Sequence, residues 1–202
     1  MLKNRDSLTR EIARAYAQAE PWQTPYTPQH SVFTHLPRVH IYRTYQALHR
    51  ALRPQLETLR AFVDITVTDT DPYRDSATMF EDIRANRHLA VFAGGTLPAG
   101  HPMADTALLL SDRSISWNIV FRAVHDGLAH YPGKRSFSPV GEWRAFQAHA
   151  ALIGHSNREA LHALFTETLA QNCVYQLTGM FAEQKAVLLP YELVQRALAL
   201  EV

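Results

Sequence analysis

Two histidines in the string VHDGLAH are the residues of this sequence that first suggest chemistry. His125 and His130 stand five positions apart, and Asp126 directly follows the first of them. Imidazole nitrogens bind zinc, iron and other transition metals, so the pair predicts a metal site. On a regular helix of 3.6 residues per turn, positions five apart point about 140° away from each other. Both histidines can then reach one metal only if the helix ends between them; if it continues, Asp126 and His130 share a face.

A carboxylate further along the chain is the third candidate ligand. Glu167 stands in the otherwise apolar string LHALFTETLAQN, which predicts a partly buried position. A buried glutamate is unfavourable unless it is paired or bound to a metal. Glu167 is therefore a candidate third ligand beside His125 and His130. The structural alternative is an ion pair of Glu167 with Arg122 or Arg144.

Three further residues are expected to assist at this site. Asp126 is predicted to orient an imidazole N–H rather than to bind the metal directly. Glu142 and His149 are seven positions apart and share a helix face, so both can approach the metal. The alternative for these two is a structural hydrogen bond between helices. We expect His155 and His162 to lie on the surface.

The string HDGLAH resembles the iron-binding His-Glu-x-x-Gly-His motif of the pterin-dependent aromatic amino acid hydroxylases. Phe165-Thr166-Glu167 is similar to the Phe-Thr-x-Glu string in which that family places its glutamate ligand, and RSFSPVGEW resembles an Arg-Ser-Phe segment between the two. The match covers about a quarter of the chain. It departs from the family at Asp126, where the motif has glutamate, and at Ala129, where it has glycine. The string is also similar to uncharacterised phage and bacterial proteins, which imply no reaction.

The resemblance implies a facial triad of His125, His130 and Glu167 around iron(II), with zinc or manganese as alternative ions. Such a triad leaves coordination positions open for dioxygen and a co-substrate, so the expected activity is that of a non-haem iron(II) oxygenase or hydroxylase acting on a small molecule. A pterin or 2-oxoglutarate would serve as reductant, and the sequence does not choose between them.

Two other functions fit parts of the same string. His125-Asp126 resembles the adjacent pair of HD-type phosphohydrolases, which use divalent metals to activate water. That family also needs an upstream histidine and a downstream aspartate; His101, directly before Pro102, is a poor upstream ligand, and no aspartate follows Asp126. The non-enzymatic alternative is a helical interaction protein with a buried His/Glu network.

The elements that must position these residues follow from periodicity, caps and proline breaks. We predict helices over residues 8–19, 39–52, 76–86, 116–130, 139–153, 159–175, 181–189 and 191–200, an extended connector over 21–29, and strands over 61–68, 89–92 and 107–110. The last two strands are expected to form a small sheet or hairpin across the loop between them. The predicted fold is mainly α, a helical domain with a small β element in the middle of the chain.

Length and composition bound the rest. The chain has 202 residues, 47% of them hydrophobic and 19% charged, with a net charge of +1. This length and composition fit one domain spanning 1–202. Its C-terminal helical half, 114–202, is expected to carry the site. The low net charge provides no field for nucleic acid, and no apolar run is long enough to span a membrane. One cysteine, Cys173, and the absence of a signal-peptide pattern favour a cytoplasmic location. Nothing in the sequence specifies an oligomeric state.

Overall fold

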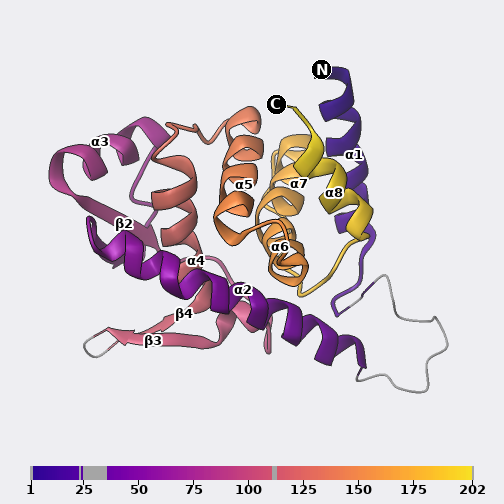
Figure 1. Ribbon diagram of the computed structural model, residues 1–202, viewed down its shortest axis with the longest axis horizontal. Helices are drawn as coiled ribbons and strands as arrows, with labels where there is room; N and C mark the ends of the chain where they lie inside the picture. Colours follow the sequence, from indigo (N-terminus) through magenta and orange to yellow (C-terminus); the bar gives the residue numbers. More distant parts are fainter. Residues whose placement is uncertain (1, 23, 25–35, 111–112, 202) are drawn as a thin grey trace.

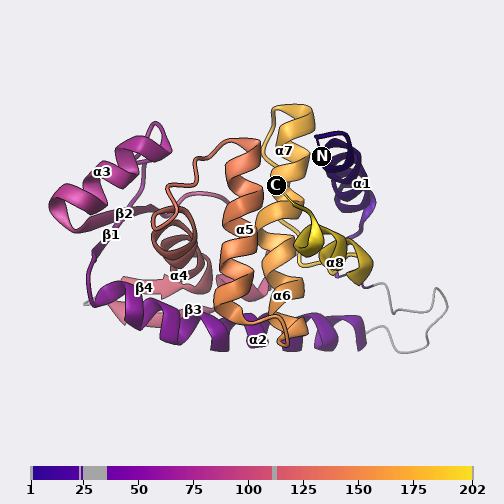
Figure 2. The ribbon, with the colours of Figure 1, turned by 45° about the horizontal axis from the view of Figure 1, so that its top comes forward.

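The long helix α2 (Leu36–Arg60) runs along one side of the molecule and beneath the ends of the upright helices (Figures 1 and 2). The sequence predicted that it ends before Pro54, but the helix continues through that proline. A proline inside a helix removes one backbone hydrogen bond. Leu52 before it and Leu56 and Leu59 after it are all buried, so packing on both sides of Pro54 outweighs the lost bond.

The computed structural model describes residues 2–22, 24, 36–110 and 113–201, and in these the architecture is mainly α-helical with a small β part. The connector expected at 21–29 lies for the most part outside the described residues. The helical elements besides α2 are α1 (Leu2–Gln18), α3 (Ser76–Asn86), η1 (Pro102–Ala104), α4 (Trp117–Val124), η2 (His125–His130), α5 (Pro139–Ile153), α6 (Arg158–Phe165), η3 (Thr166–Ala170), α7 (Gln171–Thr178) and α8 (Tyr191–Ala199). No helix in this part of the chain combines the length and the apolar character needed to cross a membrane.

The strands form two separate pairs. β1 (Asp64–Thr68) and β2 (His88–Phe92) are parallel, whereas β3 (Thr106–Leu110) and β4 (Arg113–Ser116) are antiparallel. The three predicted strands are confirmed, and β4 was not predicted. The expected pairing across the loop between β2 and β3 is wrong. Because α3 connects β1 to β2, it supplies the long crossover that a parallel pair requires, while β3 and β4 adjoin in sequence.

Two helices of the second half, α5 and α6, begin at side-chain caps. Ser138 accepts a hydrogen bond from the N–H of Gly141 at the start of α5, and Asn157 accepts one from the N–H of Ala160 at the start of α6.

The helix predicted over 181–189 is wrong, because that segment has no helical structure. Its backbone groups instead pair with side chains of other elements; Tyr16 alone donates to the Glu183 carbonyl and accepts from the Lys185 N–H.

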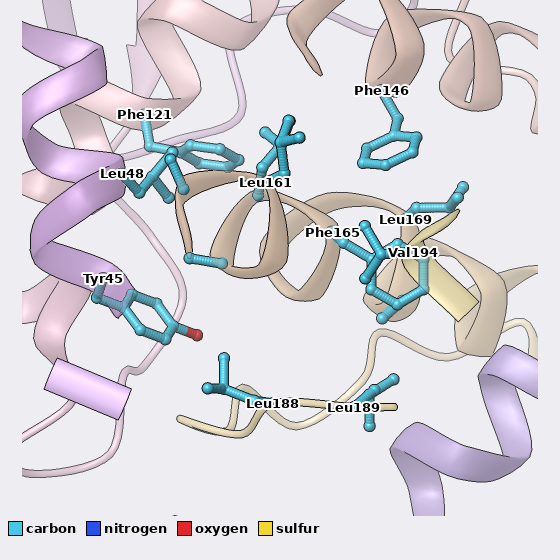
Figure 3. Packing of buried hydrophobic residues seen from close by; sticks show 14 of the residues in the cluster. Tyr45, Leu48, Phe121, Phe146, Leu161, Phe165, Leu169, Leu188, Leu189 and Val194 are labelled. Atoms are coloured by element: carbon cyan, nitrogen blue, oxygen red, sulfur yellow. The ribbon is translucent and has the colours of Figure 1, made fainter. Parts of the chain in front are cut away.

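The main core lies between α2 and the helices of the second half (Figure 3). Tyr45 of α2, Phe121 of α4 and Phe146 of α5 all point into it. Phe146 meets Phe165 of α6 edge to face, with ring centroids 5.8 Å apart. A second cluster beneath α3 and the β1–β2 pair also takes residues from the end of α2 and from α4. Residues of α2 and α4 contribute to both clusters. Packing against the two clusters therefore fixes α4 and, with it, the polar residues of α4 and of η2, which follows it directly.

Candidate metal centre

The backbone widens into a π-helix where the two predicted ligands stand. Residues His125–His130 form η2, and the N–H of Tyr131 donates to the carbonyl of Asp126, five residues earlier, at 3.0 Å. A π turn closes on the fifth residue rather than the fourth, so it brings positions five apart onto one side. The imidazole centroids of His125 and His130 lie 4.8 Å apart, edge to face. The sequence predicted that the helix must end between the two histidines if both are to reach one metal. Instead the helix continues, and its π turn brings the two imidazoles together.

Close packing holds the π-helix against α2. A Cβ atom at Gly127 would lie 2.4 Å from a methyl carbon of the Leu59 side chain, so only glycine allows this approach. Leu59 is itself fully buried. The wide turn that carries both histidines therefore rests directly on the core.

A hydrogen-bonded relay sets the tautomer of His125. Its Nδ1 lies 3.1 Å from Nδ1 of His149, whose Nε2 lies 3.0 Å from Oε1 of Gln55. Burial lowers the pKa of His149 to about 3, so this ring is neutral. The Gln55 oxygen only accepts, so His149 donates from Nε2 and its Nδ1 accepts the proton of His125. The remaining nitrogen, His125 Nε2, then carries a lone pair, and it is buried without a hydrogen-bond partner among the described residues.

His130 has the same arrangement with a different partner. Its Nδ1 donates to the backbone carbonyl of Arg135 at 2.7 Å, which leaves the lone pair on Nε2. Nε2 lies 3.6 Å from Oε2 of Glu142. Burial lowers the pKa of His130, but the hydrogen bond and charge of Glu142 raise it more, so the pKa lies above its ordinary value. Either a proton or a metal ion can occupy the space between this imidazole and the carboxylate.

Glu142 completes a group that could hold a metal ion. One ligand atom each from His125, His130 and Glu142 lie within 4.8 Å of one another. The carboxylate comes from the first turn of α5, and Gly141 beside it allows a close turn: a Cβ there would meet the Ser136 carbonyl oxygen at 1.8 Å. The sequence predicted Glu142 near the site as an assisting residue, and in the structure its carboxylate belongs to the same group as the two imidazoles.

Glu167, predicted as the third ligand, is not in that group. Its carboxylate accepts hydrogen bonds from Tyr45 and, at 3.1 Å, from Gln171, and it lies 3.6 Å from Nε2 of His101. The expected burial is present, and it raises the pKa of Glu167. Its carboxylate thus has two donors and an imidazole as partners, and not the arginine ion pair that was the structural alternative.

The remaining predicted residues lie close by in altered roles. His149 supplies the orienting contact to His125 that was expected of Asp126, and the Arg135 carbonyl supplies that of His130. Asp126 is half-buried, and burial raises its pKa to about 6. His149 of α5 pairs with Gln55 of α2, which for this residue is the structural hydrogen bond between helices that was the alternative to a site role.

One cavity of about 630 Å³ joins the two carboxylates. His125, Glu142 and Glu167 are all among its lining residues. Its volume falls in the range of small-molecule sites. Two members of the group that could hold a metal ion, His125 and Glu142, therefore lie at the wall of a space large enough for a small molecule.

Several contributors were missed at the level of sequence. Gln55 lies beyond the expected helix end at Pro54, and Tyr45 carries the spacing of an ordinary core residue. His155 is exposed as expected, but His162 is buried, with Nε2 2.5 Å from the Leu189 carbonyl oxygen. The apolar letters around His162 were the signal that could have predicted its burial.

Comparison of the chain with protein-family models, with curated proteins and with solved structures finds no match. The resemblance to the aromatic amino acid hydroxylases thus stays an expectation drawn from one motif. What the site can do follows from its own geometry.

Proposed function

We propose that this protein is a metal-dependent enzyme whose ion is held by His125, His130 and Glu142, and that the ion is iron(II) serving an oxygenase or hydroxylase reaction. The observation that carries the proposal is the mutual approach of the three ligand atoms within 4.8 Å. Two imidazoles and one carboxylate form the facial triad typical of non-haem iron(II) oxygenases. Glu167 remains the alternative third ligand.

The residues present fit such an ion. The lone pair on His125 Nε2 is buried and has no partner among the described residues, which is unfavourable unless something binds it. Both imidazoles are fixed through Nδ1 by a contact behind them, as metal-bound histidines commonly are. Glu142 supplies the negative charge that offsets a divalent cation.

When bound, iron(II) would supply dioxygen activation, with a pterin or 2-oxoglutarate as the reductant. The chain's own residues orient the ligands, through His149 and Gln55 on one side and the Arg135 carbonyl on the other. They also line the cavity in which a substrate would meet the ion. Zinc or manganese in the same ligand set would favour hydrolysis instead.

The other two functions find less support in the geometry. An HD-type phosphohydrolase needs Asp126 as a ligand, and Asp126 is outside the group that His125 and His130 form with Glu142. A structural His/Glu network would account for the contact between His130 and Glu142. It would not account for the unpaired nitrogen of His125.

A matched pair of variants tests the ligand set. Glu142→Gln and Glu167→Gln each remove one charge from the same cavity at constant size. We expect Glu142→Gln to weaken metal binding about a hundredfold or more and Glu167→Gln to change it only severalfold. Titration calorimetry with Mn²⁺ and Zn²⁺, and with Fe²⁺ under anaerobic conditions, measures both. The opposite ranking would reinstate Glu167 as the ligand.

A second measurement tests the reaction. Protein loaded with Fe²⁺ should consume dioxygen faster with one of the two reductants than without either, and Glu142→Gln should abolish the difference. Failure of the wild-type protein to bind any of the three ions would refute both metal-dependent functions and leave the structural network.

A further inference from the structure

The cavity beside the metal group is lined by more negative than positive side chains. Its carboxylates are Glu142 and Glu167 inside, and Asp71 and Glu183, which are exposed and thus stand where the cavity meets solvent. Arg122 is the only arginine or lysine among the described lining residues. Even a bound divalent ion would leave the negative charges in excess, so the electrostatic preference of the cavity is for a cation.

Arg122 is not free to bind an anion with its full guanidinium. Its Nη1 donates to the backbone carbonyls of Phe92 and Gly94, each at 2.7 Å. Its Nη2 packs so tightly on Gly95 that a Cβ there would lie 3.1 Å away. These contacts use the arginine to hold the loop after β2, which forms one wall of the cavity.

Aromatic side chains line the same opening. Tyr175 and Phe181 are stacked, with ring centroids 4.8 Å apart, and both line the cavity. Phe181 is 90% exposed, and Tyr175 and Met180 near it are exposed as well, so an apolar surface is open to solvent here. Phe92 and Phe121 continue the aromatic surface inward. Ring faces attract ammonium groups and also bind apolar groups.

From these features we infer that the cavity binds an organic cation, an amine that carries an apolar group of about the size of one ring. Its ammonium group is attracted by Asp71 and Glu183, and its apolar part lies against Tyr175 and Phe181. The unpartnered nitrogen of His125 on the cavity wall marks the place where the metal meets this ligand. The inference rests on the proposed function, because it assigns the amine as the substrate of that metal centre.

Asp71 and Glu183 are available for this contact. Within the described part of the chain, neither carboxylate takes part in a salt bridge with an arginine or lysine. Asp71 accepts a hydrogen bond from the N–H of Tyr73 at 3.3 Å, which leaves its second oxygen for a ligand. A bound ammonium would therefore be attracted by these carboxylates without breaking an ion pair of either with an arginine or lysine.

Three probes of matched size test the charge preference. Benzylamine, which is cationic at neutral pH, benzyl alcohol and benzoate share one ring and differ by one charge each. Titration calorimetry of the full chain at low ionic strength should give the order amine, alcohol, benzoate, with roughly a tenfold step between amine and alcohol. Equal affinities, or tighter binding of benzoate, would overturn the inference.

Substitutions locate the effect. Asp71→Asn and Glu183→Gln should each weaken benzylamine binding about threefold to fivefold and leave benzyl alcohol unchanged, and the double variant should lose most of the salt dependence. Glu57→Gln, which removes an exposed charge from α2, is the matched control and should have no effect. If the double variant binds benzylamine as the wild type does, the opening is not the cation site.

The two proposals fail separately. The probe series is run on metal-free protein and on protein loaded with Mn²⁺. Preference for the amine without any metal binding would retain the cation site and refute the proposed function. Metal binding that requires Glu142, together with no preference among the probes, would retain the metal centre and refute the amine substrate.

Discussion

The Nδ1 atoms of His125 and His149 lie 3.1 Å apart, and one proton must lie between them. Because Gln55 accepts the Nε2 proton of His149, the shared proton belongs to His125. The lone pair that faces the cavity is therefore set by two residues that are not ligands themselves. This relation makes His149 and Gln55 positioning residues of the proposed centre.

Replacement of His149 should weaken metal binding although the three ligands remain. In His149→Leu, the Nδ1 proton of His125 loses its acceptor and the ring can adopt the other tautomer. We expect the affinity for Mn²⁺ or Zn²⁺ to fall about tenfold to a hundredfold, as measured by titration calorimetry. His155→Leu, on an exposed loop, should have no effect.

Thermal unfolding of both variants shows whether the substitution also disturbs the core. A folded His149→Leu protein with wild-type affinity would remove the positioning role. His149→Gln keeps a side chain that can accept a hydrogen bond, so partial recovery of affinity is expected there.

The contrast between predicted and observed elements has a physical pattern. Features that depend on nearby residues were predictable: Ser138-Pro139 starts α5, Asn157 starts α6, and the string HDGLAH carries the two histidines of the group. Each follows from caps or spacing within a few residues. The helical fold and the location of the candidate site in the second half could thus be read from the sequence.

Features that depend on distant packing could not be predicted. The π-helix at His125–His130 packs at Gly127 against Leu59 of α2, and α2 passes through Pro54 with buried leucines on both sides of it. The third member of the group was assigned to Glu167 by resemblance, whereas Glu142 reaches it through the turn at Gly141. No local pattern reports which of two carboxylates a turn will bring to a histidine.

Addition of one methyl group at Gly127 should destabilise the protein and disturb the two histidines together. In Gly127→Ala the new Cβ meets Leu59, which is fully buried and has little room to move. Overpacking of this kind lowers the free energy of unfolding by about 1–3 kcal/mol. Urea unfolding measures the loss.

A double variant separates contact with Leu59 from backbone effects. Leu59→Val shortens the opposing side chain, so Gly127→Ala should be better tolerated in the Leu59→Val background than in the wild type. Additive losses in the cycle would mean that the clash is not the reason for glycine at this position.

Acid should destabilise the fold partly through His162. Burial lowers the pKa of this imidazole from 6.5 to about 4 in the folded chain. The unfolded chain therefore takes up the proton at higher pH, and the stability contributed by neutral His162 is present above pH 6.5 and lost as the pH falls towards 4. The difference amounts to about 3 kcal/mol.

The variant His162→Gln should reduce this dependence. Glutamine can still donate to the Leu189 carbonyl but does not titrate, so its free energy of unfolding should fall less between pH 7 and pH 4. Some dependence should remain, because burial also lowers the pKa of His49 to about 4. His155→Gln is the exposed control, and an unchanged slope in His162→Gln would contradict the assignment.

Arg122 should control the mobility of the cavity wall. Its guanidinium joins the carbonyls of Phe92 and Gly94, and lysine, with one ammonium on a flexible stem, cannot hold both in the same geometry. We expect Arg122→Lys to lower the free energy of unfolding by about 1–3 kcal/mol and to speed amide hydrogen exchange in residues 92–96. Arg84→Lys, in an exposed ion pair on α3, should change neither. If exchange in the loop stays at the wild-type rate, the wall is held by its own backbone and not by Arg122.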